Sequence, residues 1–154
     1  MGLDMYLYGD KSVSSEIDAN SVKEDGFIVS AKTLDMAYWR KHPNLHGFIV
    51  NTFADGEDNC QRIWLSEEDL HNIIVALEND ALYDEPVTGF FFGKSYFPGE
   101  KDEYSSYEEQ KDRDIAAFTK ALEWVRNSAR GVGKYGDPDF KWHESRSVYY
   151  QASW

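Results

Sequence analysis

The chain has 154 residues, of which 42% are hydrophobic and 16% aromatic, and its formal net charge is −12. This length and composition exclude a disordered chain and allow a core without disulfides or metals. The negative charge disfavours contact with phosphate backbones, so we expect no direct nucleic-acid binding. The single Cys60 excludes an intramolecular disulfide and favours a reducing compartment, so the cytoplasm is the expected location.

The first third of the chain predicts a strand, a loop and a helix. Residues 3–8 alternate apolar side chains with others at a period of two, which predicts an opening strand. Residues 1–8 contain no basic segment or long apolar run, so we expect neither a signal peptide nor a membrane span. Residues 9–26 predict a polar loop and residues 27–29 a short strand. Ser30 predicts the cap of a helix that ends before Pro43. One face of this helix would hold Leu34, Ala37, Tyr38 and Lys41.

The middle of the chain predicts a hairpin and then a helix. Residues 47–53 and 62–65 are rich in aromatic and β-branched side chains, and a turn at Asp55 separates them, so a hairpin is favoured. Ser66 and Asp69 have the spacing of a capping box before a helix. The apolar face of that helix would hold Leu70, Ile73, Ile74 and Leu77.

The last third predicts a strand, a long helix and a closing strand. Residues 87–92 form an apolar run before a turn at Pro98 and Gly99. Ser106 and Glu109 open a helix that Gly131 and Gly133 would end. Its apolar face would hold Ile115, Phe118, Leu122 and Val125. Residues 147–154 again predict a strand. Without regular βαβ alternation, the sequence predicts one α+β domain over residues 1–154, with a mostly antiparallel sheet and about three helices.

Five segments resemble a known family in their order and spacing. They are residues 1–7 (MGLDMYL), 38–41 (YWRK), 45–50 (LHGFIV), 88–93 (TGFFFG) and 149–154 (YYQASW). The chain resembles an uncharacterised family of small bacteriophage and prophage proteins that open with the same heptad and close with a similar aromatic tail. Some members carry a phosphoglycerate kinase label, but the enzyme of that name is a far larger two-domain protein. The resemblance implies an accessory protein made inside a bacterial cell and implies no particular activity.

Residues 89–95 (GFFFGKS) resemble a phosphate-binding P-loop only in part. The glycine spacing is one residue short, three Phe side chains crowd the backbone, and a turn rather than a helix follows. We therefore interpret this segment as a buried strand with glycines at close backbone approaches.

The best candidate binding residues are Trp39, Arg40, Lys41 and His46. Together they supply an aromatic face, a planar cationic fork and a titratable ring, which suit an anionic or base-bearing ligand or a protein partner. The alternative is structural: Trp39 packs in the core, the two cations favour a helix C-terminus, and His46 is an ordinary hydrogen-bonded residue.

A second candidate set is catalytic. Cys60, His46 and Asp58 supply the residue types of an activated thiolate, its base and an orienting carboxylate, although a lone Cys is more often an inert, buried residue. His42, His71 and His143 show no metal-ligand spacing, so we expect no metal site and no cofactor.

These observations favour a non-catalytic phage or prophage accessory protein that binds and neutralises a host factor. The factor would be a host defence protein or a nucleotide-like small molecule, contacted by Trp39, Arg40 and His46. The alternative is a small enzyme that acts on a nucleotide-like metabolite, with Cys60 or His46 in the chemistry and Arg40 or Lys41 on the anionic part. A purely structural role in an assembly also stays open.

Overall fold

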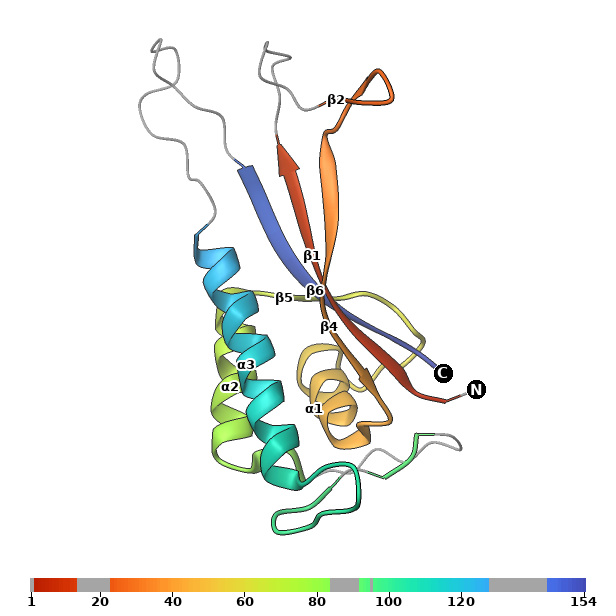
Figure 1. Ribbon diagram of the computed structural model, residues 1–154, viewed down its shortest axis with the longest axis vertical. Helices are drawn as coiled ribbons and strands as arrows, with labels where there is room; N and C mark the ends of the chain where they lie inside the picture. Colours follow the sequence, from red (N-terminus) through yellow and green to blue (C-terminus); the bar gives the residue numbers. More distant parts are fainter. Residues whose placement is uncertain (1, 14–22, 84–91, 95, 128–143) are drawn as a thin grey trace.

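A four-stranded antiparallel sheet is the centre of the computed structural model, which describes residues 2–13, 23–83, 92–94, 96–127 and 144–154. Its strands, in spatial order, are β4 (Ala31–Arg40), β1 (Asp4–Val13), β6 (Glu144–Ser153) and β5 (Ile63–Leu65). A second, two-stranded sheet pairs β2 (Lys23–Glu24) with β3 (Phe27–Ile28). Because Asp4 pairs with Ser153, the two ends of the chain lie side by side (Figure 1).

The described residues form three α-helices and one short 3₁₀ helix. They are α1 (Pro43–Phe53), α2 (Glu67–Glu78), η1 (Ala81–Tyr83) and α3 (Tyr107–Arg126). Both predicted capping boxes are present: Ser66 and Asp69 exchange hydrogen bonds before α2, and Ser106 and Glu109 do so before α3. α2 and α3 run side by side along the sheet (Figure 1). The predicted α+β class with a mostly antiparallel sheet is confirmed.

The sheet has one face toward the helices and one away from them. On β1, Leu3, Met5 and Leu7 are fully buried, whereas Tyr6 and Tyr8 alternate with them on the opposite face. One continuous core joins the inward residues of β1, β5 and β6 to all three helices, with members that include Leu45, Ile49, Leu70, Ile73, Phe118, Leu122 and Tyr150. The inner face therefore holds the core, and the outer face carries the aromatic residues of β1.

The predicted helix over residues 31–42 is wrong, because residues 31–40 form the edge strand β4. A bulge interrupts the pairing of this strand with β1. Leu7 pairs with Ala37 and Tyr8 with Asp35, so Met36 is an extra residue on β4. Met36, Ala37 and Trp39 pack against the core, whereas Leu34 and Tyr38, two members of the predicted helical face, are exposed. Met36 lies across Gly9, where an added Cβ would come within 2.4 Å of the Met36 methyl carbon.

The predicted strand over residues 47–53 and its hairpin are also wrong. Pro43 does not end a helix but occupies the first turn of α1, where its missing N–H is no loss and its fixed φ fits. Leu45, Ile49 and Val50 then bury one face of this helix. The strand at residues 63–65 exists, but it pairs with β6.

Other boundaries also differ from the predicted ones. The opening strand extends to Val13, so the predicted loop at residues 9–26 is wrong at residues 9–13 and at the short strand β2. The turn at Pro98 and Gly99 and the closing strand are confirmed. α3 ends at Arg126, and Gly131 and Gly133 lie outside the described residues. Most of the apolar run at residues 87–92 also lies outside them. In the part of the chain that is described, no helix combines the length and the apolar character needed to cross a membrane.

Candidate functional site

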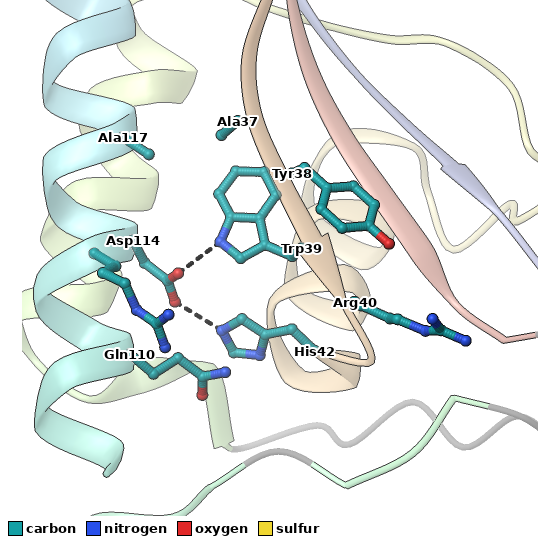
Figure 2. Close-up of a pocket in the computed structure, with 9 residues that line it drawn as sticks. Ala37, Tyr38, Trp39, Arg40, His42, Gln110, Asp114 and Ala117 are labelled. Carbon is teal, nitrogen blue, oxygen red and sulfur yellow. Dashed lines mark hydrogen bonds and ion pairs between the residues drawn. The ribbon is translucent and has the colours of Figure 1, made fainter. Parts of the chain in front are cut away.

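A buried carboxylate joins three elements at one end of the sheet. Trp39, the last inward residue of β4, donates its indole N–H to Asp114 Oδ1 of α3 at 2.7 Å. His42, the residue before α1, contacts Asp114 Oδ2 through Nε2 at 2.7 Å (Figure 2). The side chains of His42 and Asp114 are each only 2% exposed. Both carboxylate oxygens thus have a donor, which offsets the cost of burying the group, and the contact places a proton on His42 Nε2.

A cavity with a volume of about 390 Å³ lies against this cluster. Its lining combines aromatic, aliphatic and polar residues: Ala37, Tyr38, Trp39, Arg40, His42, Gln110, Arg113, Asp114 and Ala117. The Trp39 ring stacks on Phe118, with centroids 5.5 Å apart and planes 17° apart, so its orientation is fixed. Arg113 is held beside the cavity by a hydrogen bond to Ser105 Oγ at 3.1 Å. The cavity therefore offers rigid apolar walls with polar groups at fixed positions.

A second cavity, with a volume of about 730 Å³, adjoins the first because Arg40 and Gln110 line both. Its lining comes from the end of β4 and from residues 94–102: Arg40, Lys41, Lys94, Tyr96, Gly99, Glu100, Lys101, Asp102 and Gln110. The lining residues of the two cavities include five Lys or Arg and three Asp or Glu. This excess of cations is the reverse of the balance over the whole chain, whose net charge is −12. We call the two adjoining cavities the cleft.

The two exposed acids of the cleft are engaged by the loop that carries them. Asp102 accepts hydrogen bonds from the backbone N–H groups of Tyr104 and Ser105, at 2.7 and 2.9 Å, and from the Tyr96 hydroxyl. The Tyr96 bond, followed by the two backbone bonds, lowers the pKa of Asp102 below its ordinary value of 3.8. Glu100 accepts from the backbone N–H of Phe97 at 3.1 Å. Glu100 also pairs with Lys94 at 3.4 Å, but both side chains are exposed, so the pair holds Lys94 weakly.

Lys41 enters the second cavity over a glycine. A Cβ added at Gly93 would lie 2.7 Å from Lys41 Cβ and 2.9 Å from Lys41 Cδ, and Gly93 has a φ of +76°. Only glycine fits both the contact and the backbone angle. The close approach expected in segment 89–95 is therefore present at Gly93, but residues 92–94 belong to no strand, and residues 89–91 and 95 lie outside the described part of the chain.

The structure divides the predicted binding residues among three places. Trp39 and Lys41 lie at the cleft. Arg40 lines both cavities, but Figure 2 shows its side chain turned to the other face of β4. There its Nε lies 4.0 Å from Asp4 Oδ1. His46 is absent from the lining of both cavities and is fully buried in the core.

His46 belongs to a second buried cluster. Its Nδ1 lies 2.7 Å from the Tyr150 hydroxyl, and its Nε2 lies 2.8 Å from Asp58 Oδ2. The other oxygen of Asp58 accepts from the Trp154 indole N–H at 3.1 Å. Burial, followed by the charges of Asp58 and Cys60, raises the pKa of Tyr150 well above 10.0. The phenol thus stays protonated and donates to His46 Nδ1, while Nε2 donates to Asp58.

The predicted catalytic set comes together only in part. His46 and Asp58 form a hydrogen bond, and Cys60 is close enough to contribute to the raised pKa of Tyr150 in the same cluster. Both ring nitrogens of His46 already have partners, which leaves neither one to remove a proton from the Cys60 thiol. The described residues contain no group of three side chains that could hold a metal ion.

Sequence reasoning missed His42, Gln110, Arg113 and Asp114. Asp114 precedes Phe118 and Leu122 by four and eight residues, so it lies on the apolar face of α3. A carboxylate in such a position indicates a buried partner, and this signal is present in the sequence. No protein-family model, curated protein or solved structure matches this chain.

Proposed function

We propose that this chain is a non-catalytic accessory protein that binds and sequesters a nucleotide-like small molecule of a bacterial host in the cleft. The observation that carries the proposal is the pairing of an aromatic-walled cavity with a cationic one inside an acidic protein. A nucleotide has the same two parts, a planar base and an anionic phosphate. The resemblance to phage and prophage proteins supports the accessory role and a cytoplasmic location.

The first cavity suits the base. Trp39 and the two alanines provide apolar walls, and Gln110 lies where the two cavities meet. Among the residues described, nothing donates a hydrogen bond to the Gln110 side-chain oxygen, although this atom is buried. A buried acceptor without a donor costs free energy, so an N–H group of a ligand that reached it would be bound favourably.

The second cavity suits the phosphate. Lys41, Lys94 and Lys101 line it, and the acids beside them are held by loop hydrogen bonds. Lysine ammonium groups bind phosphate oxygens through charge-assisted hydrogen bonds. Sequestration rather than turnover is favoured because His46, the candidate base, has both ring nitrogens engaged away from the cleft.

The test is isothermal titration calorimetry with a panel of nucleoside mono-, di- and cyclic phosphates, with adenosine and inorganic phosphate as part-ligands. We expect at least one nucleotide to bind more tightly than either part-ligand and to be recovered chemically unchanged. Lys41→Gln combined with Lys94→Gln should lower the affinity for that nucleotide by about tenfold or more, since each charged hydrogen bond contributes about 1.5–3 kcal/mol.

The matched control is Lys32→Gln combined with Lys120→Gln, which removes the same charge from positions outside the cleft lining. It should leave the affinity unchanged. A panel without a single binder, or equal losses in the two double variants, would disprove the proposal. Conversion of the bound nucleotide would support an enzyme instead.

A further inference from the structure

The outer face of the sheet carries a continuous row of aromatic rings, which we call the aromatic stripe. It crosses all four strands of the main sheet and consists of Tyr38, Tyr6, Tyr8, Tyr149 and Trp64. Neighbouring ring centroids lie 5.3, 5.7, 5.2 and 4.9 Å apart in that order. The register explains the row, because Tyr6 pairs with Tyr38, Tyr8 with Tyr149, and Tyr149 with Trp64.

The two ends of the aromatic stripe are open to solvent. Tyr38 is 55% exposed and Trp64 is 52% exposed, although large aromatic side chains are usually buried. The described helices contribute to the core on the opposite face, with Leu3, Met5 and Leu7. Between them, Tyr6 and Tyr8 are half-buried and Tyr149 is buried, so the stripe offers a partner one exposed ring at each end and ring edges in the middle.

The surroundings of the aromatic stripe favour a cationic partner. Three carboxylates share its face with Arg40. Asp4 accepts from the Tyr38 hydroxyl at 2.5 Å and lies 4.0 Å from Arg40 Nε, Asp10 accepts from Thr33, and Asp35 pairs with Tyr8 in the strand register. Arg62 already places its guanidinium 4.9 Å from the centre of the Tyr149 ring. The face thus already holds a guanidinium on one ring of the stripe, and it carries carboxylates on β1 and β4. Both groups attract guanidinium.

We propose that the aromatic stripe docks an arginine-bearing, basic segment of a protein partner. Arginine stacks on aromatic rings and forms forked hydrogen bonds with carboxylates, and the chain supplies both on one face. The net charge of −12 attracts a basic partner and repels a phosphate backbone, which argues for a protein rather than a nucleic acid. The stripe shares Tyr38 with the lining of the first cavity, but its other four rings line neither cavity. A change at Trp64 alone therefore tests the stripe without touching the cleft, so the two proposals can fail independently.

The test is fluorescence anisotropy with two labelled peptides of equal length and charge, an Arg-Gly repeat and a Lys-Gly repeat. We expect the arginine peptide to bind more tightly, because a compact ammonium lacks the planar fork. Tyr38→Ser combined with Trp64→Ser should lower the affinity for the arginine peptide by about tenfold. Asp35→Asn should lower this affinity by a smaller factor. Circular dichroism would verify that each variant is folded.

The matched control is Phe97→Ser combined with Tyr104→Ser, which removes two exposed aromatic rings outside the aromatic stripe. This control, and the cleft variant Lys41→Gln with Lys94→Gln, should bind the arginine peptide as the parent does. Equal affinity for the two peptides would reveal a plain charge effect and overturn the proposal. The proposal would also fail if a single-stranded oligonucleotide competed for the face, or if the Tyr38 and Trp64 changes abolished self-association instead of peptide binding.

Discussion

His42 and His46 lie one helical turn apart at the start of α1, both are buried, and each contacts a carboxylate at 2.7 or 2.8 Å. Their surroundings differ. His46 has Tyr150 on one ring nitrogen and Asp58 on the other, and the Asp58 carboxylate is completed by Trp154. His42 and its partners Asp114 and Trp39 instead form part of the wall of a cavity.

A buried histidine–carboxylate pair thus does not by itself mark a functional site. The His46 cluster links α1, β6 and the segment after α1, and its donors and acceptors satisfy one another, so its role is to stabilise the fold. The Asp114 cluster also links elements, but it borders open volume. Loss of the first should change stability alone, whereas loss of the second should change both stability and ligand affinity.

The largest expected effect comes from Asp114→Ala compared with Asp58→Ala. The first change leaves the donors of Trp39 and His42 buried without their acceptor, so we expect the free energy of unfolding to fall by about 2–4 kcal/mol. The Asp58 side chain is 20% exposed, so water can take its place in Asp58→Ala, and we expect this variant to lose only about 1–2 kcal/mol of unfolding free energy. Urea unfolding measures both values. Equal losses would mean that the exposure of Asp58 does not reduce the cost of removing it. Asp114→Asn, which keeps one acceptor, should lie between the parent and Asp114→Ala.

A second loss of stability is expected when the His46 cluster loses the Tyr150 hydroxyl. Tyr150→Phe removes the donor to His46 Nδ1 and should cost about 1–3 kcal/mol of unfolding free energy, with nucleotide affinity in the cleft unchanged. Because the folded pKa of Tyr150 is raised above 10.0, the parent should also lose stability as the pH rises above that value. Unfolding curves at neutral and alkaline pH would show a shallower loss in the variant. A variant that kept the full alkaline loss would place the titrating group elsewhere.

Local signals in the sequence predict the elements that local interactions determine. Ser66 with Asp69 and Ser106 with Glu109 form capping boxes within four residues of chain, so α2 and α3 could be predicted. β4 could not, because its bulge at Met36 depends on pairing with β1, far away in the sequence. The same pairing sets the faces of Trp39 and Arg40. As consecutive strand residues they point to opposite faces, whereas the predicted set of binding residues groups them at one site.

The candidate site shows the same limit. A binding role for residues 39–41 could be predicted from their side-chain types, and Trp39 and Lys41 do line the cleft. The contact between Trp39 and Asp114 could not be predicted, because the two residues are 75 positions apart in the sequence. The predicted set contains His46 and not His42, but Pro43 starts a helix that turns His46 into the core and leaves His42 at the wall of the cavity.

The smallest expected effect compares two exposed carboxylates, one at the cleft and one away from it. Hydrogen bonds from Tyr96, Tyr104 and Ser105 lower the pKa of Asp102, and those from Tyr107 and Lys111 lower that of Asp80, each below 3.8. Both contributions to stability are thus present above that value and are lost as the pH falls through the folded pKa. Asp102→Asn and Asp80→Asn should each lower the Tm slightly at neutral pH, and the difference from the parent should vanish in acid.

Only Asp102→Asn should also weaken nucleotide binding, because Asp102 orders the loop beside Lys101, whereas Asp80 lines neither cavity. Weaker binding in the Asp80 variant would mean that the cleft responds to general loosening of the fold and would remove the specific role of the loop.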